Sequence, residues 1–310
     1  MTVHAFTATL VIATSVLAAR PVGSQAPRPD QPALFRAGAD VVRVDASVQQ
    51  DRRPVTGLRA ADFELLDNGV AQEISDVGYE KLPIDVTMLL DVSASVTGPV
   101  LEELRKALRQ VRADLAPGDR LRLLTFNMSI RRLVDFDQPA TAVEAALAST
   151  RGEGSSAVFD GLAVALTAAD APGRRRLIVL FSDGQDSSSI SDVETLLDVA
   201  RRSSPTVAVI LGSTSVEGPA SLFRATRAST PETVGGIFER IAGETGGMVA
   251  VLKPGENLTS RFRRMVQDFR SSYVLYFTPR DVERAGVHTL DVRVKRSGVD
   301  VRARRSYMWR

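Results

Sequence analysis

Short apolar runs alternate with amphipathic stretches between residues 83 and 270, and this pattern predicts βα units. Nearly continuous apolar runs are typical of strands buried in a parallel sheet, and we expect such strands at 84–90, 121–126, 176–182, 206–211 and 248–252. Helical spacing of apolar residues predicts helices near 99–115, 139–150, 158–170, 190–202, 234–244 and 257–270. A run at 131–135 follows the second strand so closely that the two should form an antiparallel hairpin. The alternation predicts an α/β domain with a doubly wound, mostly parallel sheet.

The segments on either side of this region have the two-residue period of β-strands. Polar and apolar residues alternate over 40–48, and residues 63–70 lead through an Asn68-Gly69 turn. Further strands are predicted at the carboxyl end, over 273–277, 288–294 and 299–306. Neither flank has enough strands to bury a core alone, and the ends of a domain often lie close together. We therefore expect the two flanks to form one small β-sandwich.

The amino terminus has the pattern of a targeting segment. Ala5 to Ala19 is an apolar stretch of signal-peptide length that is too short to span a bilayer comfortably. Cleavage could follow Ala19 or Ala26, whereas the lack of Lys and Arg before the stretch leaves an uncleaved anchor as the alternative. No later segment approaches the length of a membrane span. We expect an exported protein, in the periplasm or outside the cell.

These patterns together predict the organisation of the chain. It would comprise a signal peptide (1–26), a Pro-rich linker (27–36), an N-terminal β segment (37–80), the α/β domain (83–270) and a C-terminal β segment (271–310).

Composition excludes several classes of function. The formal net charge is only +2, and aromatic residues make up 5% of the chain, so the basic and aromatic platform of a nucleic-acid-binding protein is missing. The chain contains no cysteine, which excludes disulfides and thiolate metal sites. We expect no nucleic acid among the partners.

Candidate chemistry gathers in three loops. Asp91, Ser93 and Ser95 follow the strand at 84–90, Ser156 lies in a glycine-rich loop before a helix, and Asp183 follows the strand at 176–182. Ligands bind at the carboxyl ends of the strands in open α/β sheets, and these side chains offer the hard oxygen ligands that Mg²⁺, Mn²⁺ and Ca²⁺ take. Each loop by itself could equally be a turn or a helix cap. The coincidence of three such loops favours a metal site.

The three loops resemble those of the von Willebrand factor A family over roughly residues 83–270. The metal-ion-dependent adhesion site of that family combines D-x-S-x-S, a threonine loop and T-D-G. Asp91-Val92-Ser93-Ala94-Ser95 matches the first motif in full. Ser156 and Ser182 stand where the family has threonine, and Ser155 replaces a glycine. The resemblance implies the Rossmann-like fold of that family.

The flanks extend the resemblance to almost the whole mature chain. The sequences at 41–48 and 57–69, and the tyrosine-led segment from Tyr273 to Tyr307, look like those of exported bacterial proteins related to this family and abundant in Acidobacteria.

By resemblance, Ser93, Ser95 and Ser156 would contact Mg²⁺, or Mn²⁺ or Ca²⁺, directly, and Asp91 and Asp183 would act largely through bound waters. The resemblance further implies that the cation bridges to an Asp or Glu carboxylate of a protein partner. The protein would then be an adhesion or complex-assembly module. Around this edge, residues 212–233 form a long polar loop that is either functional or merely flexible. Ser187 to Ser189 either rim the site or cap the next helix.

Two other classes of function compete with this interpretation. In a structural envelope protein, the metal would only stabilise the three loops and would not bind a partner. A metal-assisted hydrolase would need a base, but the only histidines are His4, in the predicted signal peptide, and His288, which we expect to be a half-buried sheet residue. The chain has no P-loop and no nucleophile elbow. We therefore expect a protein that is not an enzyme.

Overall fold

The computed structural model describes residues 41–309, apart from 80–81, 169–170, 172, 213–233 and 254. The chain divides into Met1–Ala39, which lies outside the described residues, and Asp40–Arg310, to which everything below belongs. The predicted signal peptide, the linker and nearly all of the loop at 212–233 are therefore not described. None of the described helices combines the length and apolar character needed to cross a membrane.

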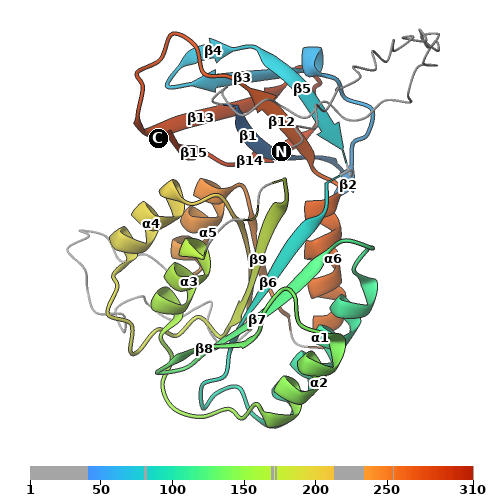
Figure 1. The fold of residues 1–310 in the computed structure, drawn as a ribbon, viewed down its shortest axis with the longest axis vertical. Helices are drawn as coiled ribbons and strands as arrows, with labels where there is room; N and C mark the ends of the chain where they lie inside the picture. Colours follow the sequence, from blue (N-terminus) through green and yellow to red (C-terminus); the bar gives the residue numbers. More distant parts are fainter. Residues whose placement is uncertain are drawn as a thin grey trace, which may run out of the picture. The chain divides into compact units, whose positions relative to one another are not determined.

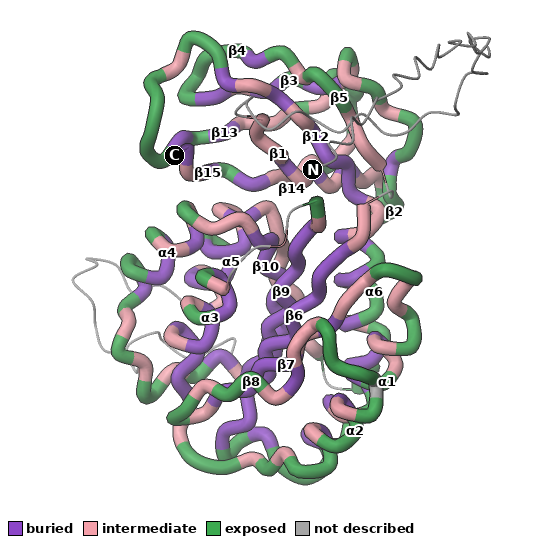
Figure 2. Tube along the Cα trace, viewed as in Figure 1, coloured by how far each residue is buried: buried purple, intermediate pink, exposed green. Residues whose placement is uncertain are grey.

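A six-stranded sheet in the order β11-β10-β9-β6-β7-β8 forms the centre of the α/β domain (Figure 1). Its strands are β6 (Ile84–Asp91), β7 (Arg120–Phe126), β8 (Ile130–Val134), β9 (Arg175–Ser182), β10 (Thr206–Leu211) and β11 (Met248–Val251). All neighbouring pairs are parallel except β7 and β8, which pair antiparallel as their short connection predicts. Every residue of β6 and β9 is buried (Figure 2), because helices cover both faces of the sheet.

The helices form two layers, each with its own apolar core. They are α1 (Gly98–Asp114), α2 (Ala140–Ser149), α3 (Val158–Thr167), α4 (Val193–Arg202), α5 (Val234–Thr245) and α6 (Leu258–Arg270). Side chains of α1, α2 and α6 pack on one face of the sheet, and those of α3, α4 and α5 pack on the other. The predicted doubly wound α/β fold is confirmed.

Strands from both flanks pair with one another in two further sheets. One sheet has the order β14-β1-β12-β5, with β2 beside β1, and the other has the order β15-β13-β3-β4. The strands are β1 (Val42–Gln50), β2 (Arg53–Pro54), β3 (Phe63–Asp67), β4 (Val70–Gln72), β5 (Ile74–Tyr79), β12 (Tyr273–Phe277), β13 (Gly286–Val294), β14 (Asp300–Ala303) and β15 (Ser306–Trp309). Residues of both sheets share a single apolar core. This confirms the predicted sandwich of the two flanks.

The structure departs from the sequence-based boundaries at several elements. Helix α4 begins at Val193 rather than near residue 190, because the Asp192 side chain caps it by accepting a hydrogen bond from the Thr195 amide. The predicted strand at 299–306 is divided into β14 and β15. Strand β5 was not predicted, because the alternation over Ile74–Tyr79 is weak and none of its residues is fully buried.

Arg175 links the α/β domain to the sandwich. It begins β9, its side chain is only 1% exposed, and its Nε donates a 2.6 Å hydrogen bond to Oδ1 of Asp45 in β1. One terminal nitrogen also donates to the Phe269 carbonyl at 2.7 Å, and the guanidinium lies 4.3 Å from the centre of the Phe269 ring. A buried charge of this kind is tolerated only when it is paired and hydrogen-bonded, so these contacts fix the start of β9 against β1.

Candidate functional site

Asp91 is the last residue of the buried strand β6 and is itself 0% exposed. Its Oδ1 accepts a 2.9 Å hydrogen bond from the Ser93 amide. Its Oδ2 accepts hydrogen bonds from the Ser156 hydroxyl at 3.1 Å and from the Ser182 hydroxyl at 2.7 Å. One carboxylate therefore joins all three loops that the sequence singled out. We name this arrangement the three-loop site: Asp91, Ser93, Ser95, Ser156, Ser182 and Asp183.

The first loop brings two hydroxyl groups together. Ser93 and Ser95 have their Oγ atoms 3.1 Å apart. Ser93 is buried and Ser95 is exposed, so the pair runs from the interior of the site to its surface. The loop is held by two backbone hydrogen bonds to the glycine-rich loop, from the Ala94 amide to the Gly154 carbonyl and from the Glu153 amide to the Val92 carbonyl, each 2.9 Å long.

Gly152 allows the first two loops to lie this close to each other. A Cβ atom at this position would lie 2.1 Å from the carbonyl oxygen of Val96 and 2.8 Å from Cγ2 of Thr97. Because Val96 presents backbone rather than a flexible side-chain end, no rotamer change could relieve the first of these clashes. The glycine therefore determines the separation of the loops that carry Ser95 and Ser156.

The third loop turns at Gly184, which has a φ of +81°. This is the left-handed conformation that favours glycine. The Ser182 hydroxyl accepts a 2.9 Å hydrogen bond from the Gly184 amide while donating to Asp91. Asp183 is half-buried, and its Oδ1 accepts a 3.0 Å hydrogen bond from the Gln185 amide.

Electrostatics distinguish Asp91 from an ordinary surface carboxylate. Burial raises its pKa above the usual value, and the nearby negative charge of Asp183 raises it further. Hydrogen bonds from Ser93 and Ser182 oppose this shift without cancelling it. Two carboxylates held together in a poorly solvated place repel each other, and a bound cation would relieve that repulsion.

The chemistry of the donor set agrees with a hard divalent cation. Among the described residues, no group of three or more His, Cys, Asp and Glu side chains forms a metal-ligand set. The three-loop site instead has two carboxylates surrounded by hydroxyl groups. Such a set offers only oxygen and too few protein charges to neutralise and enclose a cation, which is the usual setting for Mg²⁺ with retained waters.

Two further carboxylates, which sequence reasoning did not assign, shape the rim of the site. Asp160, in the first turn of α3, accepts hydrogen bonds from the Ile190 amide at 2.8 Å and the Ser191 amide at 2.9 Å. Burial alone would raise the pKa of Asp160, but these hydrogen bonds lower it overall. Asp186 accepts from the amides of Val158 at 3.3 Å and Ser189 at 3.2 Å. In the sequence, the only signal for Asp160 was its position four residues after Ser156.

The serines after Asp186 do not cap the next helix, which was one of the two roles that the sequence left open. The Ser187 hydroxyl accepts a hydrogen bond from the Ser156 amide at 3.1 Å, and the Ser189 hydroxyl accepts one from the Asp160 amide at 3.1 Å. They therefore support the glycine-rich loop, whereas the cap of α4 is Asp192.

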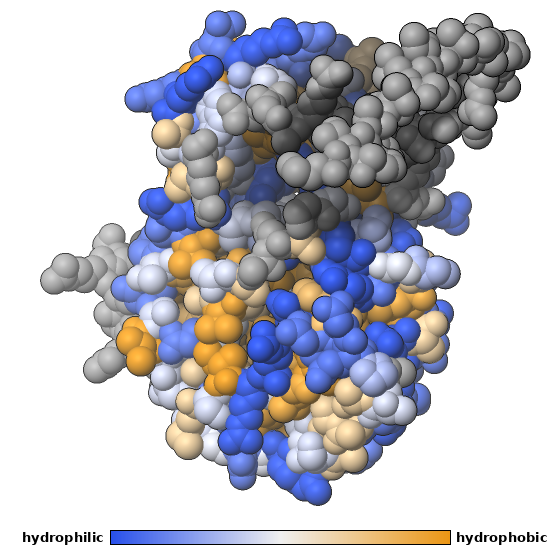
Figure 3. Space-filling view, in the orientation of Figure 1, coloured by the Kyte–Doolittle hydropathy of each residue, from blue (hydrophilic) through white to orange (hydrophobic). Residues whose placement is uncertain are grey.

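Two exposed apolar side chains flank these loops. Ile190 is 94% exposed and Met128 is 69% exposed, the highest fractions among the large hydrophobic residues described. Met128 borders Gly154, and the Ile190 amide is bound by Asp160. The face drawn in Figure 3 mixes hydrophobic and hydrophilic residues over the α/β domain.

His288 does not belong to the three-loop site. It lies in β13 of the sandwich and is 1% exposed, so it is fully buried rather than half-buried as expected. Its Nδ1 lies 2.8 Å from Oδ1 of Asp67, and the Tyr307 hydroxyl donates a 2.6 Å hydrogen bond to Oδ2 of the same carboxylate. The three side chains form a closed polar cluster inside the sandwich core.

Comparison with known families identifies the central part of the chain. The family model of the von Willebrand factor type A domain matches residues 85–222. This segment contains all of Asp91, Ser93, Ser95, Ser156 and Asp183.

The chain is also similar to solved structures at low sequence identity. The von Willebrand factor type A structure from Catenulispora acidiphila is 12% identical, with a TM-score of 0.50 over 88% of this chain and 75% of that one. BatB from Bacteroides thetaiotaomicron is 15% identical, with a TM-score of 0.46 over 60% of this chain and 98% of its own. The vWF domain of the type V pili tip protein Mfa5 from Porphyromonas gingivalis is 12% identical. Its TM-score is 0.44, and the match covers 60% of this chain and 94% of that domain.

Proposed function

Residues 85–222 are a von Willebrand factor type A domain, and on that premise we propose that the three-loop site holds a divalent cation and binds a protein partner. Ser93, Ser95 and Ser156 would be its direct ligands, with Asp91 and Asp183 acting largely through water. The observation that carries the proposal is the Asp91 carboxylate, which receives hydrogen bonds from Ser93, Ser156 and Ser182 at the end of one buried strand.

The roles of the protein groups follow from their positions. Asp91, buried and held on both oxygens, orients the hydroxyls of Ser156 and Ser182. Ser95 is exposed and so stands where a partner would approach. A bound Mg²⁺ or Mn²⁺ would supply the positive charge that attracts an Asp or Glu carboxylate of the partner. Without it, Asp91 and Asp183 would repel such a carboxylate.

We propose further that the protein is exported and works in the cell envelope or outside the cell. The support is the apolar stretch from Ala5 to Ala19, which has the length of a signal peptide. In this setting the domain would serve adhesion or the assembly of a complex. A hydrolase has no comparable support, because His288 is enclosed with Asp67 and Tyr307 in the sandwich.

Capture of partners with and without metal tests this function. Wild type and Asp183→Ala would be immobilised and exposed to envelope extract of the source organism, in Mn²⁺ or in EDTA. Asp198→Ala is the matched control, because that carboxylate is exposed on α4 and pairs with Arg202, its one ion-pair partner among the described residues. We expect a protein captured by wild type and Asp198→Ala in Mn²⁺, and lost with EDTA or with Asp183→Ala.

The competing structural role gives a different result. If the cation only stabilised the loops, Mn²⁺ would raise the melting temperature of wild type. The amount of partner protein captured would then be the same in Mn²⁺ and in EDTA. That pair of results would contradict partner binding through the cation.

A further inference from the structure

The exposed apolar side chains of this protein gather at one edge of the central sheet. Six large hydrophobic residues are exposed among those that the structure describes, and three of them follow the carboxyl ends of β6, β7 and β9. These are Val100 in the first turn of α1, Met128 in the turn between β7 and β8, and Ile190 in the loop before α4. Single exposed apolar residues are ordinary on a protein surface, whereas three around one candidate site indicate an interaction surface.

The turn that carries Met128 is fixed to the glycine-rich loop. The Asn127 side chain donates a 3.1 Å hydrogen bond to the Glu153 carbonyl. A Cβ atom on Gly154 would lie 3.5 Å from Cε of Met128. The Met128 side chain therefore lies beside this loop, two residues before Ser156.

The segment that carries Ile190 is fixed to the other end of the same loop. The Ile190 amide donates a 2.8 Å hydrogen bond to Oδ2 of Asp160, and the Ser187 amide donates one of 2.8 Å to the Ser156 carbonyl. Although its backbone is held in this way, Ile190 is 94% exposed. Met128 and Ile190 therefore flank Ser156 from the two ends of the loop.

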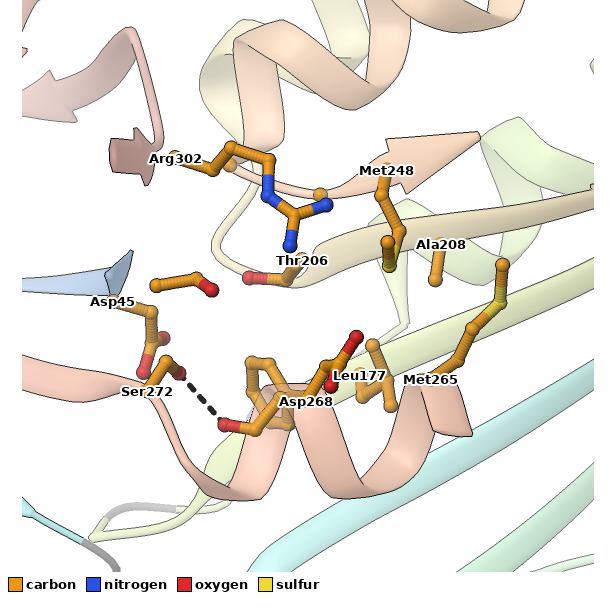
Figure 4. Close-up of a pocket in the computed structure, with 13 residues that line it drawn as sticks. Asp45, Leu177, Thr206, Ala208, Met248, Met265, Asp268, Ser272 and Arg302 are labelled. Atoms are coloured by element: carbon orange, nitrogen blue, oxygen red, sulfur yellow. Dashed lines mark hydrogen bonds between the residues drawn. The ribbon is translucent and has the colours of Figure 1, made fainter. Parts of the chain in front are cut away.

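The opposite edge of the sheet is covered by the protein itself. Where β9, β10 and β11 begin, strands of the sandwich and the end of α6 lie over them, and the hollow that remains has a volume of about 30 Å³. That is room for one or two water molecules. Arg302 and Asp268, whose charges attract each other, point toward each other across this hollow (Figure 4). The end of the sheet that remains for a partner is therefore the carboxyl edge.

The charge of the loops at that edge restricts the partner. Residues 91–97, 127–129, 151–160 and 182–192 contain six acidic residues and one basic residue, Arg151. One divalent cation neutralises only part of this charge, so a run of acidic residues on a partner would be repelled. A single carboxylate that binds the cation avoids this cost. Apolar side chains beside that carboxylate gain free energy by covering Met128 and Ile190.

We propose that the partner segment carries one Asp or Glu between large apolar side chains. The carboxylate binds the cation, and the apolar side chains pack on Met128 and Ile190. This inference rests on the proposed function, because the cation at the three-loop site makes the central contact. It excludes a partner that binds through an acidic run or through the carboxylate alone.

Peptide selection tests the inference. A random dodecapeptide library displayed on phage would be bound to the immobilised protein in Mn²⁺ and eluted with EDTA. We expect the eluted peptides to share a single Asp or Glu, with Leu, Ile, Met, Val and Phe enriched on both sides of it relative to the unselected library. Eluted peptides with an acidic residue but no apolar enrichment, or with several acidic residues together, would overturn the inference and leave the proposed function standing.

One eluted peptide, synthesised in three versions, measures each contribution by fluorescence anisotropy. Replacing its acidic residue by the corresponding amide should abolish binding. Replacing one flanking apolar residue by Ser should weaken binding about tenfold, because covering a large apolar side chain is worth roughly that factor.

Variants of the protein assign the surface. Ile190→Ser and Met128→Ser should each weaken the parent peptide about tenfold and leave the calorimetric titration with Mn²⁺ unchanged. Val287→Ser is the control and should bind the peptide as wild type does, because this residue is 37% exposed but lies in β13 of the sandwich.

The Mn²⁺ titration separates two levels of failure. If wild type gives no heat with Mn²⁺, the proposed function and this inference fail together. If the heat is present but no peptide is eluted, or both variants bind the parent peptide as wild type does, only this inference fails. If a serine variant loses the Mn²⁺ heat, the three peptide versions on wild type still decide.

Discussion

The Ser182 hydroxyl donates a 2.7 Å hydrogen bond to Oδ2 of Asp91 and so ties the carboxyl end of β9 to that of β6. The Ser182 Oγ in turn accepts a 2.9 Å hydrogen bond from the Gly184 amide. One small side chain thus fixes both the orientation of the buried carboxylate and the turn that carries Asp183.

Ser182→Ala should therefore destabilise the protein. The change leaves the Gly184 amide without its acceptor and Asp91 with one donor fewer, which costs about 1–3 kcal/mol when groups are buried. Urea unfolding in EDTA measures the effect without a contribution from metal. Ser182→Thr keeps the hydroxyl and should restore most of the stability, whereas equal stability of Ser182→Ala and wild type would contradict the role given to this bond.

Gly152→Ala should separate the first two loops of the site. The added methyl group would meet the Val96 carbonyl at 2.1 Å, so the backbone must move, and with it Ser95 and Ser156. We expect a loss of stability of about 1–3 kcal/mol and weaker binding of Mn²⁺. Gly78→Ala is the control, because its Cβ would meet Val274 at an ordinary 3.7 Å. Unchanged Mn²⁺ affinity in Gly152→Ala would show that the close approach is unimportant for the site.

The pH dependence of stability should report on Asp85. This residue is 2% exposed, and its carboxylate accepts hydrogen bonds from Nη2 of Arg120 at 2.6 Å and from Nε of Arg174 at 2.5 Å. Burial by itself would raise the pKa of Asp85, but the hydrogen bonds and charges of the two arginines outweigh it and lower the pKa below 3.8. Its stabilisation is thus complete above the unfolded pKa and is lost as pH falls through the folded pKa.

Asp85→Asn should accordingly cost about 3 kcal/mol at pH 7, the usual effect of breaking a buried ion pair. The difference in the free energy of unfolding between this variant and wild type should stay constant down to about pH 5. It should shrink below the ordinary aspartate pKa. Chemical unfolding at a series of pH values measures it. Asp137→Asn, which removes an exposed partner of Arg120, should have little effect; a difference for Asp85→Asn that grows towards acid pH would refute this account.

Export can be tested at the amino terminus. Edman sequencing of the protein purified from its source should begin at Arg20 or Pro27, directly after Ala19 or Ala26. A cleaved leader follows from the length of the apolar stretch and the small residues after it. A mature protein that still begins at Met1 would instead favour the uncleaved anchor.

The sequence was sufficient to predict the sheet and the three loops, because apolar runs and their carboxyl-end Asp and Ser residues are local signals. Asp91 and Asp183 could be placed at the carboxyl ends of β6 and β9 for this reason. Asp160 could not, because its partners, the amides of Ile190 and Ser191, lie thirty positions away and backbone donors leave no trace in composition.

The central claim is that Asp183 and the serines around Asp91 hold a divalent cation, and calorimetric titration of Mn²⁺ tests it most directly. Wild type and Asp198→Ala should give the same saturable heat at one site, and Asp183→Ala should give none while unfolding at a similar urea concentration. At a hundredfold excess of Mn²⁺ over its Kd, the folded wild type should gain about 2.7 kcal/mol of stability. Equal heats for wild type and Asp183→Ala would contradict the claim.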